Sequence, residues 1–107
     1  METWLLLVET KCKDETRHAE FNDWYDTVHI PDILNDSPGF KSATRYVTRD
    51  TEKTGGTRYL AVYEIETDNI RETMKAHSEN VEAKKAMGRW TDSLEVVARR
   101  LCQVHNL

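Results

Sequence analysis

One stretch, residues 20–46, sets narrow limits on how this chain can fold. It reads EFNDWYDTVHIPDILNDSPGFKSATRY and passes from a helical pattern, through two prolines, to the start of a strand. From Arg17 to Asn35, apolar side chains recur every three or four residues, which is the spacing of one helix face. That face is predicted to contain Phe21, Tyr25, Val28 and Asp32, with His29 next to them.

Two prolines bear on where this helix ends: Pro31 lies within the helical segment, and Pro38 lies just after it. Pro31 lacks a backbone N–H and disfavours helical geometry in the residue before it, so we expect the helix to end or kink near His29 or Ile30. A short second turn is predicted from Pro31 to Leu34. The Asp36-Ser37-Pro38-Gly39 sequence is then typical of a tight turn.

Strand patterns occupy the middle and the start of the chain. Phe40 to Asp50 and Thr57 to Glu66 each alternate between two faces, which predicts two strands. The polar stretch from Thr51 to Gly56 suits the loop of an antiparallel hairpin. Thr3 to Lys11 is apolar and rich in strand formers, so it is predicted to be the first strand.

A second helix and a last strand complete the pattern. The helix is predicted from about Asn69 to Arg89, with Thr67 or Asp68 as its N-cap and with Gly88 near its end. Ser93 to His105 carries apolar residues on both faces, so we expect a strand that is covered on both sides.

The predicted order is β-α-β-β-α-β, which is the ferredoxin-like arrangement of the α+β class with a four-stranded antiparallel sheet. With 107 residues, the chain is expected to form a single domain over residues 1–107. The two helices cover one face of such a sheet. Because the other face is also rather apolar, we expect a second copy of the sheet to cover it in a homodimer.

The composition restricts the kinds of partner. With 38% hydrophobic and 32% charged residues, it is that of a soluble globular protein. The net charge of -4 leaves no basic stripe, so a nucleic-acid partner is not expected. The apolar run Trp4–Val8 is too short for a signal peptide or a membrane span, and a cytoplasmic location is expected. Cys12 and Cys102 are predicted to be free thiols.

The chain resembles a known superfamily over residues 21–46. The residues that carry the resemblance are Trp24-Tyr25-Asp26, His29-Ile30-Pro31-Asp32, Pro38-Gly39-Phe40 and Ala43-Thr44-Arg45-Tyr46. They resemble the dimeric α+β barrel superfamily, and within it the ethyl tert-butyl ether degradation (EthD)-like branch. The resemblance implies two sheets packed into a shared barrel, with one pocket per subunit between sheet and helices. The superfamily contains cyclases, isomerases, monooxygenases and haem-degrading enzymes, so the fold leaves the reaction open.

His29 is the first candidate for catalysis. A histidine suits proton removal near neutral pH, although one at a helix end can instead cap backbone carbonyls. Asp32 is predicted either to orient the imidazole or to cap the turn at Pro31. In cyclase and isomerase relatives a pocket histidine and a polar neighbour move protons, and the resemblance matches these to His29 and Asp32. A second histidine of some cyclases corresponds loosely to His77, which makes His77 a candidate for substrate binding. Its polar neighbours Ser78 and Glu79 instead favour a position at the surface.

Aromatic residues are the candidates for the pocket wall. Trp24 and Tyr25 are predicted to contact a substrate, and Tyr25 adds a hydroxyl, although aromatic residues at helical spacing also form ordinary cores. The strand tyrosines Tyr46 and Tyr63 are candidates for hydroxyl groups in the pocket. The sequence leaves open which sheet face each one occupies. Tyr63 is preferred as the residue that stabilises developing oxyanion charge.

These residues predict a cofactor-independent enzyme with a small-molecule substrate. The predicted reaction is cyclisation, dehydration or isomerisation of a cyclic or aromatic, polyketide-like or lactone-like metabolite. A cofactor-free monooxygenase, a non-catalytic ligand-binding accessory protein and a haem-handling protein are the alternatives. No nucleotide, hydride or zinc motif is present in the sequence, and His29 with Asp32 supplies only two metal ligands, so no cofactor and no metal are expected.

Overall fold

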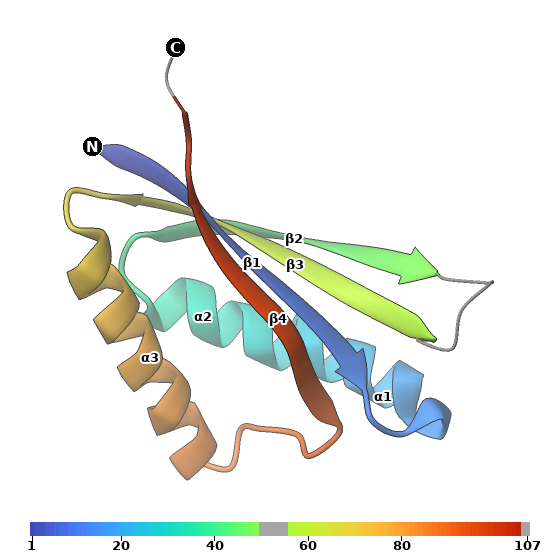
Figure 1. Cartoon of the computed structure of the whole chain (residues 1–107). Helices are drawn as coiled ribbons and strands as arrows, with labels where there is room; N and C mark the ends of the chain where they lie inside the picture. The colour runs from blue at the N-terminus through green and yellow to red at the C-terminus, as the bar shows by residue number, and fades with distance from the viewer. Residues whose placement is uncertain (50–55, 106–107) are drawn as a thin grey trace.

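The computed structural model describes residues 1–49 and 56–105. Its strands are β1 (Glu2–Cys12), β2 (Phe40–Arg49), β3 (Thr57–Thr67) and β4 (Leu94–Gln103). Its helices are η1 (Glu15–Arg17), α1 (His18–Trp24), η2 (Tyr25–His29), α2 (Ile30–Asp36) and α3 (Ile70–Ala86). The sheet is antiparallel throughout, in the order β2-β3-β1-β4 (Figure 1). The predicted ferredoxin-like fold is therefore confirmed, while most of the predicted 51–56 hairpin loop lies outside the described residues.

Of the two expected outcomes at Pro31, an end or a kink of the helix near His29 or Ile30, the first is wrong, because the helical segment does not end there. Helical structure runs unbroken from α1 through η2 into α2. The segment η2 is a π-helix, in which the Ile30 N–H donates to the carbonyl of Tyr25, five residues back. Pro31 is the second residue of α2 and directly follows this π-turn.

The extra residue in the π-turn also changes which side chains face the sheet. The buried residues of this segment are Phe21, Tyr25, His29 and Ile33. The predicted face had Val28 and Asp32 in the last two places, because it assumed regular α-helical spacing. One residue added to the turn moves the buried positions on by one, and it carries His29 into the interior.

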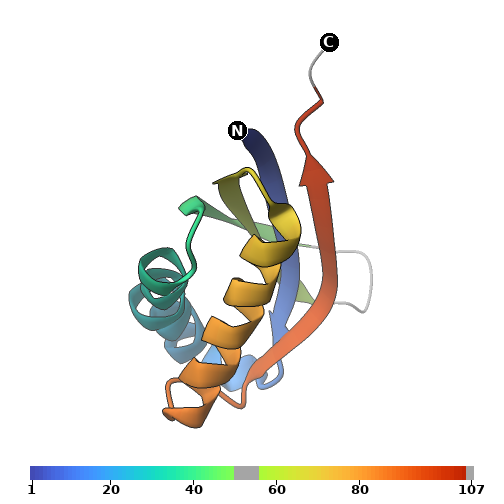
Figure 2. The same cartoon turned by 90° about the vertical axis from the view of Figure 1, so that its left-hand side faces the viewer.

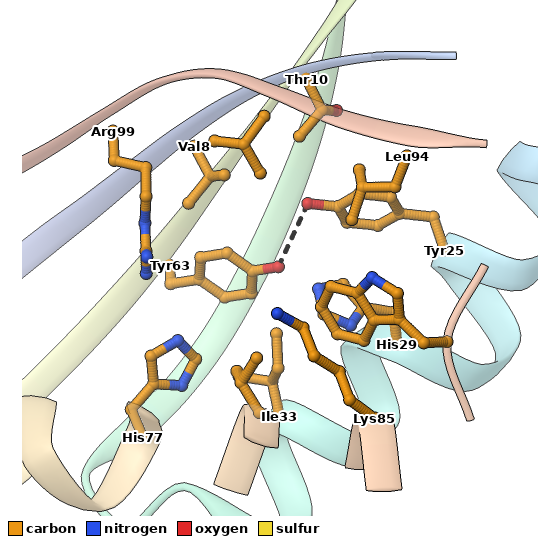
Figure 3. A pocket seen from close by; sticks show the side chains of 13 residues that line it. Val8, Thr10, Tyr25, His29, Ile33, Tyr63, His77, Lys85, Leu94 and Arg99 are labelled. Atoms are coloured by element: carbon orange, nitrogen blue, oxygen red, sulfur yellow. Dashed lines mark hydrogen bonds between the residues drawn. The ribbon is translucent and has the colours of Figure 1, made fainter. Parts of the chain in front are cut away.

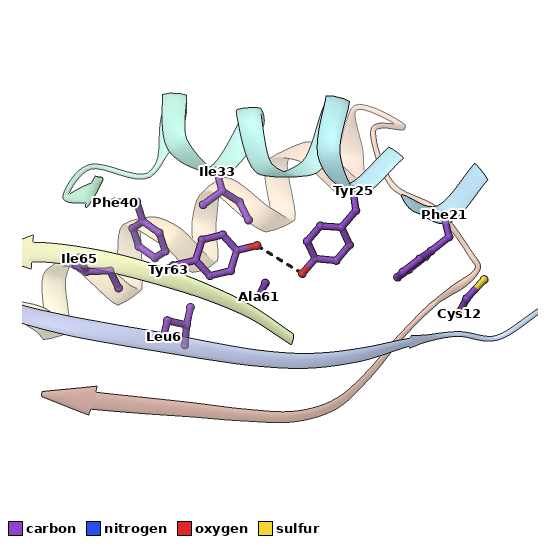
Figure 4. Close-up of a cluster of buried hydrophobic side chains, with 9 residues drawn as sticks. All are labelled: Leu6, Cys12, Phe21, Tyr25, Ile33, Phe40, Ala61, Tyr63 and Ile65. Carbon is purple, nitrogen blue, oxygen red and sulfur yellow. Dashed lines mark hydrogen bonds between the residues drawn. The ribbon is translucent and has the colours of Figure 1, made fainter. Parts of the chain in front are cut away.

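The core lies between the sheet and the helices. Figure 2 shows the helices on the same side of the sheet. Along β3, every second residue faces them, so Ala61, Tyr63 and Ile65 are buried. The buried apolar cluster contains Leu6, Cys12, Phe21, Tyr25, Ile33, Phe40, Ala61, Tyr63 and Ile65 (Figure 4). As predicted, Cys12 and Cys102 are free thiols.

Helix α3 is shorter than predicted and has a different cap. Asn69, rather than Thr67 or Asp68, is the N-cap, and its side-chain oxygen accepts the Glu72 N–H at 3.2 Å. The Thr67 hydroxyl oxygen instead accepts the Asn69 N–H at 3.0 Å. The helix ends at Ala86, and Gly88 follows with φ of +74°.

Strand β4 is an edge strand, and the expectation that both of its faces are covered is wrong for the single chain. Val96 is 48% exposed and Leu101 38% exposed, because the two helices do not extend over the whole strand. No described helix covers the opposite face of the sheet, which we call the outer face. Its half-buried apolar residues are Leu5, Leu7, Leu60 and Val62. Among the described residues, no helix is long and apolar enough to cross a membrane.

Candidate functional site

A cavity of about 110 Å³ lies between the sheet and the helices. Its apolar wall is formed by Val8, Ile33, Val81, Trp90, Leu94 and Val96. Its polar lining residues are Thr10, Tyr25, His29, Tyr63, His77, Lys85 and Arg99 (Figure 3). The cavity thus combines an apolar wall with a few polar groups, which is typical of small-molecule sites.

His29 reaches the cavity from the π-helix η2. Its ring stacks on Trp24 at a centroid distance of 4.7 Å and meets the rings of Tyr25 and Trp90 edge-on at 4.9 Å and 5.0 Å. The pKa of His29 is lowered from 6.5 to about 4, mainly by burial, with smaller lowering effects of His77 and Arg45 and an opposing effect of Asp32. The imidazole is therefore neutral at pH 7, with one nitrogen able to accept a proton.

The nitrogens of His29 are free to interact with a ligand. Within residues 1–49 and 56–105, its ring contacts are aromatic, and neither nitrogen has a hydrogen-bond partner. The other histidines of the interior and its margin are engaged: His18 bonds Tyr59 and Glu15, and His77 bonds Ser37. His29 is thus fixed in position by packing alone.

Two tyrosine hydroxyls meet at the centre of the cavity. The hydroxyl oxygens of Tyr25 and Tyr63 lie 3.5 Å apart, and either can be the donor. Burial raises the pKa of both residues, so both remain protonated at neutral pH and can donate to a negatively charged oxygen. The Arg45 guanidinium lies 4.2 Å from the centre of the Tyr25 ring. Its charge favours a developing anion here.

His77 is buried, and its expected position at the surface is wrong. It is only 3% exposed, its Nδ1 lies 3.0 Å from the Ser37 hydroxyl oxygen, and its ring stacks on Phe40 at 4.5 Å. The polar neighbours that suggested exposure lie on the other side of α3, while Thr73 and Asn80 share the buried side with His77. Burial, followed by the charge of Arg99, lowers the pKa of His77 to about 4.

Comparison with known proteins places this chain in a family. A family model described as a domain of unknown function, DUF4286, matches residues 4–104. The chain belongs to the DUF4286 family. A comparison with curated proteins gave no match.

The DUF4286 chain also matches solved structures of low sequence identity. A dimeric ferredoxin-like protein from an uncultured marine organism has 14% identity and a TM-score of 0.63, over 97% of this chain and 96% of that one. SnoaB, a cofactor-independent oxygenase from Streptomyces nogalater, has 14% identity and a TM-score of 0.56, over 100% and 97%. An EthD family protein from Bacillus halodurans has 17% identity and a TM-score of 0.51, over 98% and 100%. These matches confirm the resemblance to the superfamily at the level of the fold.

The other predicted site residues of the DUF4286 chain do not all face the cavity. Asp32 is bound by Arg89, whose guanidinium donates to its two carboxylate oxygens at 2.7 Å and 3.0 Å. The Trp24 ring does not line the cavity but stacks on the His29 ring, and its indole N–H donates to the Arg89 carbonyl at 3.3 Å. Tyr46 is 54% exposed on the outer face, because Arg45 next to it faces the helices and neighbours in a strand alternate. Only Tyr25, His29, Tyr63 and His77 of the predicted set line the cavity.

Several lining residues were not predicted from the sequence. Trp90 lies in the connection between α3 and β4, outside any periodic pattern. Arg99 follows the apolar residues Val96, Val97 and Ala98 in β4, and this change from apolar to charged residues is a signal that sequence reasoning could have used. Thr10 is 1% exposed, and its hydroxyl has no hydrogen-bond partner among the described residues. No group of three or more potential metal ligands converges in the described part of the chain.

Proposed function

We propose that this protein is a small enzyme that uses histidine acid-base chemistry without a cofactor. The substrate class is a cyclic or aromatic, polyketide-like or lactone-like metabolite, and the reaction is a cyclisation, dehydration or isomerisation. The observation that carries the proposal is His29, a neutral imidazole held by aromatic packing at the wall of a cavity, with no hydrogen bond to either nitrogen from the described residues. A general base must be unprotonated and within reach of its substrate, and His29 meets the first condition at pH 7.

In the proposed mechanism, His29 removes a proton from an activated carbon or hydroxyl. The electron pair moves onto the neighbouring substrate oxygen, and the hydroxyls of Tyr25 and Tyr63 donate hydrogen bonds to that oxygen. Their raised pKa supports this role, because they keep their protons while the charge develops. In an isomerisation, the protonated imidazole then returns its proton to a different carbon of the substrate while the oxyanion electrons re-form the carbonyl. In a dehydration, it gives the proton to a hydroxyl on the neighbouring carbon, the C–O bond breaks as the electrons of the enolate return, and the hydroxyl leaves as water.

The size of the cavity limits what it can enclose. A cavity of about 110 Å³ is smaller than the roughly 300–1,000 Å³ of common ligand pockets. We therefore assign it to the reacting ring alone. The rest of a larger substrate would extend past Val96, which is 48% exposed at the edge strand, and past the exposed Lys85.

A substrate panel with a His29 variant tests this function. Enol-lactones are followed by absorbance and anthrones by absorbance and an oxygen electrode, with His29→Gln compared against wild type. We expect turnover by the wild type and a loss of at least about a hundredfold in the variant, since general base catalysis contributes about 10²–10⁴. Turnover that survives in His29→Gln would refute the assignment of the base. Ligand binding without turnover of any panel member would favour the non-catalytic alternative.

A cofactor-free monooxygenase is the second candidate, supported by the similarity of the fold to SnoaB, which is described as a cofactor-independent oxygenase. In that case the same base makes a substrate carbanion, and molecular oxygen accepts its electrons. Stoichiometric oxygen uptake with an anthrone would select this reaction. An isomerase or a lyase consumes no oxygen.

We also propose that two copies of the chain pair through the outer face. Leu7 and Leu60 are half-buried there without a covering element, and Tyr46 is 54% exposed. Burying such a face is favourable in water, and the similar marine protein is described as dimeric. Light scattering coupled to gel filtration should give twice the chain mass for wild type and one chain mass for Leu60→Lys. Ser78→Lys adds the same charge on exposed α3 and should remain a dimer, whereas a monomeric wild type would refute the pairing.

A further inference from the structure

Three buried polar side chains form a chain of hydrogen bonds beside the cavity, where α2 and α3 are in contact. They are Ser37, His77 and Asn80, and we call this chain the relay. The Asn80 Nδ2 donates to the Ser37 hydroxyl oxygen at 2.9 Å and to the Asp32 carbonyl at 3.2 Å. A carbonyl oxygen cannot donate, so the contact with Asp32 fixes which end of the Asn80 amide is the nitrogen. The Ser37 oxygen therefore accepts one hydrogen bond from Asn80, and its own proton is free to be donated elsewhere.

The relay determines which nitrogen of His77 carries the proton. His77 Nδ1, at 3.0 Å, is the acceptor available to the Ser37 hydroxyl among the described residues. If Nδ1 carried the proton instead, Ser37 would accept twice, and its own O–H would be buried without a partner. That arrangement costs roughly 1–3 kcal/mol. His77 is therefore the Nε2–H tautomer, with a hydrogen-bond donor left over for a ligand.

A positive charge lies at the same end of the cavity. Figure 3 shows His77 and the guanidinium of Arg99 on one side of Tyr63, and His29 on the other. Within residues 1–49 and 56–105, no carboxylate pairs with Arg99. Lys85, the other cation of the lining, lies 3.5 Å from Glu82 and 4.9 Å from the centre of the Trp90 ring. Arg99 is thus the uncompensated charge of the site.

We propose that His77 Nε2–H and the Arg99 guanidinium together bind a carboxylate oxygen of the substrate. This orients the substrate with its acidic oxygen toward α3 and its reacting proton toward His29. This proposal rests on the proposed function in one respect: it takes the cavity to be the site where the substrate binds. His77 acts as a donor, and His29 alone has the role of base.

Nitrogen-15 NMR of histidine-labelled protein tests the tautomer before any substrate is known. Long-range proton–nitrogen spectra at pH 7 should show a protonated Nε2 and a bare Nδ1 for His77. Ser37→Ala should change this pattern toward a mixture of tautomers, while the wild-type spectrum suffices if that variant does not fold. A protonated Nδ1 in the wild type would overturn the relay.

Binding of an anionic probe and of its neutral counterpart tests whether His77 and Arg99 form an anion site. Benzoate should shift the His77 Nε2 resonance, and benzamide of the same shape should bind at least about tenfold more weakly, because charge-assisted hydrogen bonds are the stronger ones. Arg99→Gln should remove this preference, and Arg71→Gln, at an exposed position of α3, should keep it. Equal binding of both probes, or binding of neither, would overturn the anion site. Loss of turnover in His29→Gln is a separate result, so the two proposals can fail independently.

Discussion

The two buried histidines should make the stability of this protein fall as the pH is lowered from 7 to 5. Both have a pKa near 4 in the folded protein, against 6.5 for an unperturbed histidine. Between these values the unfolded chain binds a proton at each site and the folded chain does not. The free energy of unfolding therefore decreases as the pH falls through this window, and the loss is complete below pH 4.

The size of the effect follows from the pKa difference. From pH 7 to pH 5, a histidine whose pKa moves from 6.5 to about 4 removes about 2 kcal/mol, so the pair removes about 4 kcal/mol. A domain of this size has a total stability of roughly 5–15 kcal/mol. Acidification alone should thus remove a large share of the stability.

Urea denaturation at several pH values, followed by tryptophan fluorescence, measures this loss. The variants His29→Gln and His77→Gln should each reduce the decrease between pH 7 and pH 5 by about half, whatever their stability at pH 7. The matched control is His105→Gln, which removes an exposed histidine and should leave the decrease unchanged. A decrease that persists in full in both variants would refute the argument that burial keeps these imidazoles neutral.

Two further predictions concern the stability contributed by Gly39 and by Tyr63. Gly39 has φ of +90°, and a Cβ there would lie 3.1 Å from the Glu66 carbonyl, so Gly39→Ala should cost more than the roughly 1–2 kcal/mol of a left-handed residue. The control is Gly88→Ala, where φ is +74° and no atom of the described residues lies near the added Cβ, so this variant should lose only the roughly 1–2 kcal/mol of the left-handed backbone. Equal urea midpoints for the two variants would contradict the predicted clash at Gly39. Tyr63→Phe removes a hydroxyl with one 3.5 Å contact and should change stability by less than about 1 kcal/mol, whereas Tyr63→Ala leaves a cavity and should cost about 3–5 kcal/mol. Thermal denaturation checks this pair, and Tyr46→Phe at its exposed position should have no effect.

The sequence alone determined the fold, because periodicity is a local property. Alternation over Thr57–Glu66 predicted β3, and the three- and four-residue spacing after Asn69 predicted α3. The resemblance of residues 21–46 to a known superfamily, and not periodicity, made Tyr25 and His29 candidate site residues, and both line the cavity. Periodicity erred by one residue at Val28, since a π-turn has no clear signature in an amphipathic pattern.

Only the tertiary structure decided what the polar residues do. The burial of His77 depends on how α3 packs against α2, and its tautomer depends on Ser37, which lies 40 positions away in the sequence. Asp32 was a possible partner of His29 until the chain brought Arg89, 57 positions away, against its carboxylate. Contacts between residues so far apart are set by the packing of whole elements, so no spacing in the sequence records them.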